Sequence, residues 1–159
     1  MRLSARSLKW LMMFYPPLLF NRIRPVYVAA DFQHIRVKIA RSWLNRNING
    51  SVFGGTLACA FDPWVGVMYW RILQQLNRPA QIWVKKVELD FRKPGLTALY
   101  IDFRITDEDL RATLETLDAE GKSVRAYVAH AINTQGEICA TATVHLYIRQ
   151  TTVQAGLGF

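Results

Sequence analysis

Residues 47–62 read NINGSVFGGTLACAFD. The first half of this stretch is rich in Asn, Gly and Ser, which is typical of a loop, and the second half is an apolar run. Gly54 and Gly55 stand at the start of that run, where backbone N–H groups have no partner inside a helix. Because glycine has no Cβ, a carbonyl oxygen can approach these N–H groups closely. The stretch therefore predicts a polar loop and then an apolar helix, from about residue 54 to about residue 76, whose first turn could bind a carbonyl group.

Asp62 lies inside the apolar run, eight residues after Gly54. A carboxylate among apolar side chains loses hydration, so its pKa rises, which suits a general base or a nucleophile. The next residue is Pro63, and an Asp-Pro pair in a helical pattern also marks a kink or the start of a second helix, with the Asp as a cap. The residues alone leave both interpretations open.

The remaining pattern predicts a sheet. Alternating or apolar runs predict strands at about residues 32–40, 82–91, 99–105, 123–133 and 137–149. A change of register near Lys85 and Lys86 predicts a β-bulge, residues 134–136 predict a hairpin turn, and residues 106–109 predict the capped start of a short helix. One long apolar helix and these strands indicate an α+β fold in which an antiparallel sheet wraps around a central helix.

Length and composition favour one small domain that assembles with copies of itself. The chain has 159 residues, of which 51% are hydrophobic, so a single core fits and apolar surface remains for a partner. We divide it into a helical extension (1–28), a sheet domain (29–150) and a tail (151–159). Two cysteines far apart in sequence suit a reducing compartment, so we expect a cytoplasmic protein.

The net charge of +8 favours anionic ligands, such as the phosphates of coenzyme A, nucleic acid or an anionic membrane. No zinc, helix-turn-helix or RNA-recognition signature is present, so nucleic acid is not expected. No metal site is expected either, because His34, His130 and His145 occur singly. His130 shares an apolar face with Val128 and Ile132, which predicts a core position.

The N-terminal 20 residues resemble a signal peptide only in outline. Their apolar run is broken by Pro16-Pro17 and followed by Arg22 and Arg24, which argues against export. The run is too short to span a bilayer, which needs about 20 apolar residues. We expect a helix that packs over the sheet or lies on a membrane surface through residues 1–20.

The spacing of Asn47, Gly54 and Asp62 resembles that in hotdog-fold thioesterases of the phenylacetate-pathway and 4-hydroxybenzoyl-CoA type. In those enzymes an amide residue precedes a His-Gly-Gly at a helix N-terminus, and an Asp or Glu follows eight residues past the first Gly. The chain is still more similar, from about Tyr15 to Arg149, to a hotdog family known as domain of unknown function 4442. The segments that carry this similarity are Asn45-Arg46-Asn47 with Gly50, Phe53-Gly54-Gly55, Asp62-Pro63, Phe91-Arg92-Lys93-Pro94-Gly95 and Gln135-Gly136-Glu137.

The resemblance implies a hotdog fold and hydrolysis of an acyl thioester such as acyl-CoA. Gly54 would polarise the thioester carbonyl, Asp62 would activate water or attack directly, and Asn47 would orient the water or the acid. The residues expected to contact substrate are Phe53, Gly55, Lys85, Arg92 and Lys93. No separate cofactor is implied, since coenzyme A enters as part of the substrate.

Two positions depart from the thioesterase pattern. Phe53 stands where the His is usual, and Gly66 stands four residues past the acid, where some thioesterases carry Ser or Thr. These departures favour an alternative in which the protein binds an acyl-CoA or fatty acyl group without turnover. A hydratase or dehydratase is disfavoured, because none of the three histidines lies between Gly54 and Asp62.

The helix geometry adds a prediction about assembly. Eight residues of α-helix advance about 12 Å, too far for Gly54 and Asp62 of one chain to reach one carbonyl together. If two helices run antiparallel across a dimer, Gly54 of one chain faces Asp62 of the other. We therefore expect a homodimer or a dimer of dimers with shared sites.

Overall fold

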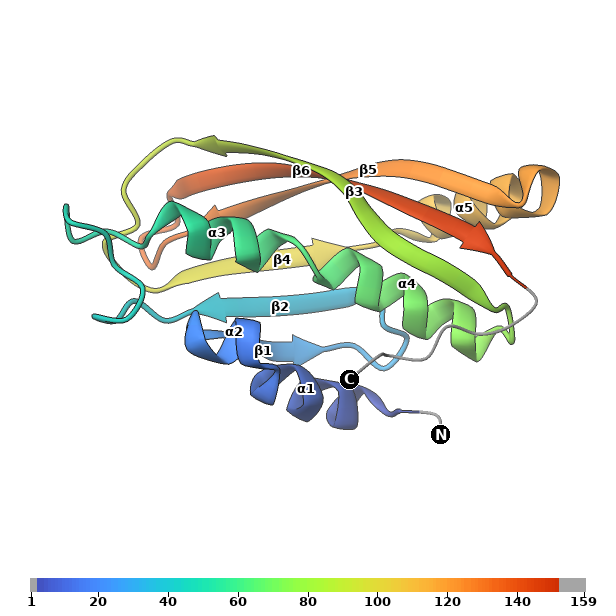
Figure 1. The fold of residues 1–159 in the computed structure, drawn as a ribbon, viewed down its shortest axis with the longest axis horizontal. Helices are drawn as coiled ribbons and strands as arrows, with labels where there is room; N and C mark the ends of the chain where they lie inside the picture. Colours follow the sequence, from blue (N-terminus) through green and yellow to red (C-terminus); the bar gives the residue numbers. More distant parts are fainter. Residues whose placement is uncertain (1–2, 152–159) are drawn as a thin grey trace.

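The computed structural model describes residues 3–151; Arg2 and the predicted tail beyond Thr151 lie outside this range. Six strands form one antiparallel sheet (Figure 1). The strands are β1 (Ile23–Val28), β2 (His34–Ile39), β3 (Ala80–Phe91), β4 (Leu99–Arg104), β5 (Lys122–Ile132) and β6 (Ile138–Gln150). The helices are α1 (Ala5–Phe14), α2 (Pro16–Phe20), α3 (Gly54–Phe61), α4 (Trp64–Gln75) and α5 (Asp107–Glu120). The spatial order of the strands is β1-β2-β4-β5-β6-β3, so β1 and β3 are the two edges.

Helices α3 and α4 run in line across one face of the sheet (Figure 1). Their inward side chains, including Phe61, Trp64 and Met68, have no solvent exposure. They pack against equally buried strand residues such as Ile35 and Val144. Each large apolar side chain buried in this way contributes about 1.5–3 kcal/mol. The predicted architecture, an antiparallel sheet around a central helix, is confirmed.

The central helix is interrupted, so the prediction of one helix from residue 54 to residue 76 is wrong in that detail. α3 ends at Phe61, and α4 begins at Trp64, with Asp62 and Pro63 between them. Proline lacks a backbone N–H and crowds the residue before it, so the intrahelical hydrogen bonds cannot continue through this point. The Asp-Pro pair therefore marks the start of a second helix, which was one of the interpretations that the sequence left open.

The N-terminal extension contains the expected helix, as α1, a short second helix, α2, and a strand that the sequence pattern did not predict. Residues 23–28, which we assigned to the helical extension, form β1 and pair with β2. This strand was missed because Pro25 argues against a strand, since proline is rare within sheets except at an edge. β1 is such an edge strand. None of the helices among residues 3–151 is long and apolar enough to cross a membrane.

Several local predictions are confirmed. The register of β3 against β6 shifts between Val84 and Lys86, which is the predicted bulge. Gly136 adopts a φ of +84° in the turn between β5 and β6, as the hairpin requires. Thr106 and Asp109 form a reciprocal capping box at the start of α5. His130, in contrast, is exposed and bonded to Thr141, so its predicted core position is wrong.

The error at His130 has a simple origin. Both faces of β5 carry apolar residues, so alternation alone does not say which face is inside. The buried face carries Tyr127, Ala129 and Ala131. Tyr127 can face inward because its hydroxyl group has a hydrogen-bonding partner in the core, the hydroxyl group of Tyr69.

Candidate active site

The first turn of α3 presents unpaired backbone N–H groups. Phe53 occupies the N-cap position, and its own N–H donates to the carbonyl of Asn45 at 2.8 Å. No side chain caps the helix, and no hydrogen bond among residues 3–151 engages the N–H of Gly54 or Gly55. With no acidic side chain in this first turn either, the partial positive charge of the helix start is uncompensated. The free N–H groups that the sequence predicts at the helix start are present at Gly54 and Gly55, and their binding of a carbonyl group stays a prediction.

Asn45 fixes the approach to this turn. It is almost fully buried, and its amide nitrogen donates to the carbonyls of Asn21 and Ala40, each at 3.0 Å. Its amide oxygen accepts the N–H of Ser42 at 2.8 Å. All these contacts are within the fold, so Asn45 is a structural amide that holds the loop before α3 against the N-terminal segment.

Two phenyl rings cover the glycine pair. A Cβ added at Gly54 would lie 3.1 Å from the tip of the Phe91 ring, and one added at Gly55 would clash with the ring of Phe53. Phe53 is 55% exposed and Phe91 57% exposed, so solvent reaches both rings. The glycines therefore do two things: they leave N–H groups free and they make room for these aromatic side chains.

Asn47 lies in a tight turn that precedes the helix. Its side-chain oxygen accepts the N–H groups of Asn49 at 3.0 Å and Ser51 at 3.2 Å. Its amide nitrogen donates to the Ser51 hydroxyl at 2.9 Å. Most of the hydrogen-bonding capacity of Asn47 is thus used by its own loop, and one amide N–H remains for a ligand.

A pocket of about 590 Å³ opens beside the helix start. It lies between the residue 47–54 segment and the segment that follows β3. The lining residues are Asn47, Asn49, Ser51, Val52, Gly54, Leu57, Phe91, Arg92, Lys93, Pro94, Gly95 and Leu96. Four predicted site residues, Asn47, Gly54, Arg92 and Lys93, are thereby brought to one cavity. None of the lining residues is a histidine.

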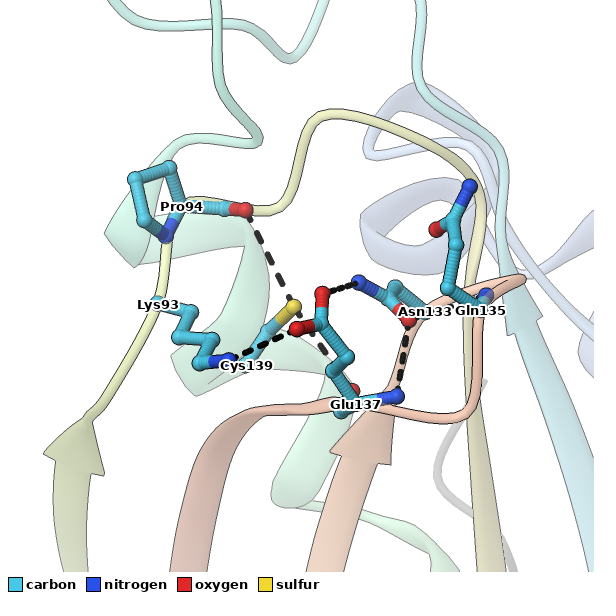
Figure 2. Close-up of polar contacts among 6 residues, drawn as sticks. All are labelled: Lys93, Pro94, Asn133, Gln135, Glu137 and Cys139. Carbon is cyan, nitrogen blue, oxygen red and sulfur yellow. Dashed lines mark hydrogen bonds and ion pairs between the residues drawn. The ribbon is translucent and has the colours of Figure 1, made fainter.

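Acidic residues pair with the basic residues of the pocket wall, and Figure 2 shows the Lys93–Glu137 pair. Lys93 donates to Glu137 at 2.7 Å, and this hydrogen bond raises the pKa of Lys93. The same bond, with help from Asn133, lowers the pKa of Glu137. Arg92 pairs with Asp90 at 3.0 Å. Because these pairs are exposed, each cation can still turn toward an anionic ligand at little cost.

The turn between β5 and β6 braces this wall. The oxygen of the Asn133 side chain accepts the N–H groups of Gln135 at 3.0 Å and Glu137 at 2.9 Å. The carbonyl of Cys139 accepts the N–H groups of Arg92 and Lys93. Val52 in turn donates to the carbonyl of Gly95 at 2.9 Å, which joins the wall to the loop before α3. Sequence patterns did not identify Asn133 and Glu137 as site-forming, because the contact between Lys93 and Glu137 joins residues 44 positions apart.

Asp62 stands at the other end of α3 and does not line the pocket. Its side chain reaches solvent in the single chain, yet the surrounding protein removes enough hydration to raise the pKa of the carboxyl group. Within residues 3–151 it has no hydrogen bond or ion pair, so its side chain does not act as a cap. The role of Asp62 as a general base stays a prediction.

The other residues that were predicted to contact substrate do not line the pocket. Phe53 and Gly55 adjoin the pocket through the helix start but do not line it. Lys85 is exposed at the bulge of β3, outside the cavity. Among the described residues, no group of three or more His, Cys, Asp or Glu side chains could hold a metal ion.

The comparison with protein families identifies the chain. The model of the family described as a domain of unknown function, DUF4442, matches residues 4–148. The chain belongs to the DUF4442 family. No protein with a curated description matches it.

Solved structures show that this DUF4442 protein has the hotdog fold. A probable thioesterase of unknown function from Pseudomonas aeruginosa superposes with a TM-score of 0.79 at 18% identity, covering 95% of this chain and 99% of that one. A thioesterase from Haemophilus influenzae gives a TM-score of 0.70 at 7% identity, with 97% and 96% covered. The PaaI protein of the E. coli phenylacetic acid degradation operon gives 0.61 at 12% identity, with 94% of each chain covered.

Proposed function

We propose that this DUF4442 protein hydrolyses acyl thioesters, with acyl-CoA as the substrate class. The observation that carries the proposal is the free N–H of Gly54 at an uncapped helix start that opens into a pocket of about 590 Å³. In the tetrahedral intermediate of thioester hydrolysis, negative charge develops on the carbonyl oxygen. A preorganised N–H at a helix N-terminus stabilises that charge, and Gly55 is a neighbouring donor.

Asp62 supplies the second part of the reaction. It either removes a proton from the attacking water, or attacks the carbonyl carbon itself to form an acyl-Asp62 anhydride that water then hydrolyses. In both cases the C–S bond breaks, and the thiolate of the carrier leaves and is protonated. Within one chain, Asp62 lies at the far end of α3, about 12 Å along the helix from Gly54. The acid in each site therefore comes from a second copy of the chain.

The edge strand β3 is the surface that would join two copies. It is 12 residues long, pairs on one side with β6, and has no partner on its other side among residues 3–151. A long open edge is a template for pairing with another chain. Both α3 and α4 contact β3, so antiparallel pairing of β3 with its own copy about a two-fold axis places the two α3 helices near each other.

The remaining groups bind the substrate. Arg92 and Lys93 on the pocket wall attract the phosphates of coenzyme A, and Lys85 offers a further cation beside the β3 edge. The one free amide N–H of Asn47 can hold the attacking water or the acid. The phenyl rings of Phe53 and Phe91 provide an apolar surface for the acyl group.

A binding protein without turnover is the second candidate. The observation that favours it is the coverage of Gly54 and Gly55 by the rings of Phe91 and Phe53, since a thioester carbonyl must reach past them. In that case the pocket would bind an acyl group and its carrier, and no bond would be cleaved.

Release of free thiol from a panel of acyl-CoAs, with binding measured in parallel, separates these candidates. Asp62→Asn should lower turnover at least about 100-fold, because general-base catalysis is worth that much, with binding retained. Gly54→Val should also lower turnover, since a branched side chain obstructs the N–H. Binding without thiol release by the unmodified protein would establish the second candidate, and neither binding nor release would reject both.

A further inference from the structure

The excess of positive over negative charge lies in one part of the sequence. Residues 1–61 contain nine Lys or Arg residues and a single acid, Asp31, whereas the rest of the chain contains eleven basic and eleven acidic residues. The whole net charge of +8 therefore lies in the first 61 residues. This segment forms α1, α2, β1, β2 and the loop that leads into α3. The three N-terminal elements α1, α2 and β1 lie together along one edge of the molecule (Figure 1).

Helices α1 and α2 direct large apolar side chains toward solvent. α1 buries Leu8 and Met12 against the protein, while Trp10 is 52% exposed and Phe14 62% exposed. The rings of Trp10 and Phe14 stack with their centroids 6.0 Å apart. On α2, Phe20 is 71% exposed. Both helices pack on the protein through their buried residues, and these aromatic side chains lie on the opposite, solvent-exposed side.

The loop before α3 carries two further exposed apolar residues. Asn45 bonds to the carbonyl of Asn21, just after α2, which holds the loop beside the helices. Trp43 is 76% exposed and Ile48 is fully exposed on the same loop. We call the exposed apolar residues of α1 and α2, which are Trp10, Phe14, Leu19 and Phe20, the N-terminal apolar face.

Free cations adjoin the N-terminal apolar face. Arg22 and Arg24 help to line a hollow of about 290 Å³ whose other walls include Phe14 and Leu19. No ion pair among residues 3–151 involves Arg6, Arg22 or Arg24. An apolar hollow beside two available guanidinium groups suits an acyl chain next to an anionic head group.

We propose that the N-terminal apolar face docks on an anionic lipid bilayer. Aromatic side chains enter the boundary between head groups and acyl chains, and nearby Arg residues are attracted to anionic lipids. A second copy is a poorer occupant, because a two-fold contact would place the same positive charge against itself. Nucleic acid would satisfy the cations but would leave the aliphatic side chain of Leu19 without a favourable contact.

Docking in this way would bring the candidate active site close to the lipid. α2 contacts α3, and the Thr56 hydroxyl in α3 donates to the side chain of Asn21 at 3.0 Å. The loop that carries Trp43 and Ile48 continues directly into the pocket lining at Asn49 and Ser51. The bilayer proposal does not depend on the proposed hydrolysis, because it concerns a different surface.

Flotation of the full chain with vesicles tests the proposal. The two compositions are an equimolar mixture of phosphatidylcholine and phosphatidylglycerol, and phosphatidylcholine alone. We expect flotation with the anionic vesicles, at least about tenfold weaker binding to the neutral ones, and loss of binding as NaCl is raised. The double variants Phe14→Ser/Phe20→Ser and Arg22→Glu/Arg24→Glu should each weaken binding at least about tenfold. Val128→Ser, which alters an exposed apolar residue on the interior strand β5, is the control and should bind as the unmodified chain does.

Four results would overturn the proposal. The first is the absence of flotation with anionic vesicles. The second is equal binding of all the variants, shown by thermal unfolding to be folded. The third is displacement from vesicles by duplex DNA at equal phosphate concentration, which would identify nucleic acid as the preferred partner. If the Phe14→Ser/Phe20→Ser variant changes sedimentation mass without changing flotation, the apolar face is a contact between copies and the bilayer proposal is also rejected.

Discussion

The carboxyl group of Asp62 has a raised pKa and no hydrogen bond or ion pair among residues 3–151. The raised pKa predicts opposite pH dependences for the stability of the fold and for the proposed catalytic rate. A raised pKa means that the fold disfavours the charged form, so stability falls as pH rises from the ordinary carboxyl range through the raised pKa. Catalysis by a base needs that charged form, so the rate rises over the same pH range.

Asp62→Asn should therefore leave the thermal midpoint at neutral pH unchanged or slightly higher while turnover is lost. In the unmodified protein, the acid limb of kcat/KM for thiol release should lie above the ordinary Asp range. Glu120→Gln, at an exposed carboxyl at the end of α5, is the control and should keep this limb in place. A marked loss of stability in Asp62→Asn would indicate a structural role instead.

Phe91 forms the pocket wall nearest Gly54, so it should limit the size of the acyl group. Phe91→Ala should shift the ratio of kcat/KM for long over short acyl-CoAs upward by at least about fivefold, because each added methylene in an apolar site is worth about 1–3 kcal/mol. Val128→Ala is the control, since Val128 is an exposed apolar residue of β5 that lies outside the pocket lining. If both variants change the ratio equally, the acyl group does not lie against Phe91 in particular.

Among elements, the turn between β5 and β6 acts as a brace through Asn133. Its side-chain oxygen satisfies two backbone N–H groups, so Asn133→Ala should lower the free energy of unfolding by about 1–3 kcal/mol. Gln135→Ala, in the same turn, should change it by less than about 0.5 kcal/mol, because its exposed side chain bonds only to the adjacent Thr134. Denaturant titration of both variants measures the difference; equal midpoints would show that the turn does not depend on Asn133.

Elements with one clear periodicity were predictable from sequence, and the exceptions have physical causes. The strands after α4, the bulge at Lys85 and the α5 capping box follow from local patterns and were predicted. β1 was not, because an edge strand tolerates Pro25, which elsewhere argues against a strand. The free N–H groups at Gly54 followed from the glycine pair, but the bracing by Glu137 did not, since a contact between distant segments leaves no local pattern.

For the whole molecule, the proposed shared site makes a prediction about mixed dimers. Gly54→Val and Asp62→Asn chains are each expected to be inactive, and they are refolded together in equal amounts. A mixed dimer has one site with both defects and one intact site, so activity should return to about a quarter of the unmodified level for random pairing. Mass spectrometry confirms that mixed dimers form. If they form and stay inactive, each site takes Gly54 and Asp62 from one chain.

The two edges of the sheet differ in a way that limits assembly. On β1, Pro25 offers no N–H, the register shifts after Pro25, and the Lys9 ammonium group occupies the carbonyl of Val26 at 2.7 Å. A sheet with two open edges could add copies without end and grow into a fibre. Here α1 and the bulged β1 block one edge, so the proposed pairing through β3 would stop at two molecules. The same N-terminal segment that we propose docks on lipid would thus also prevent sheet polymerisation, and its deletion should convert the proposed dimers into open-ended aggregates.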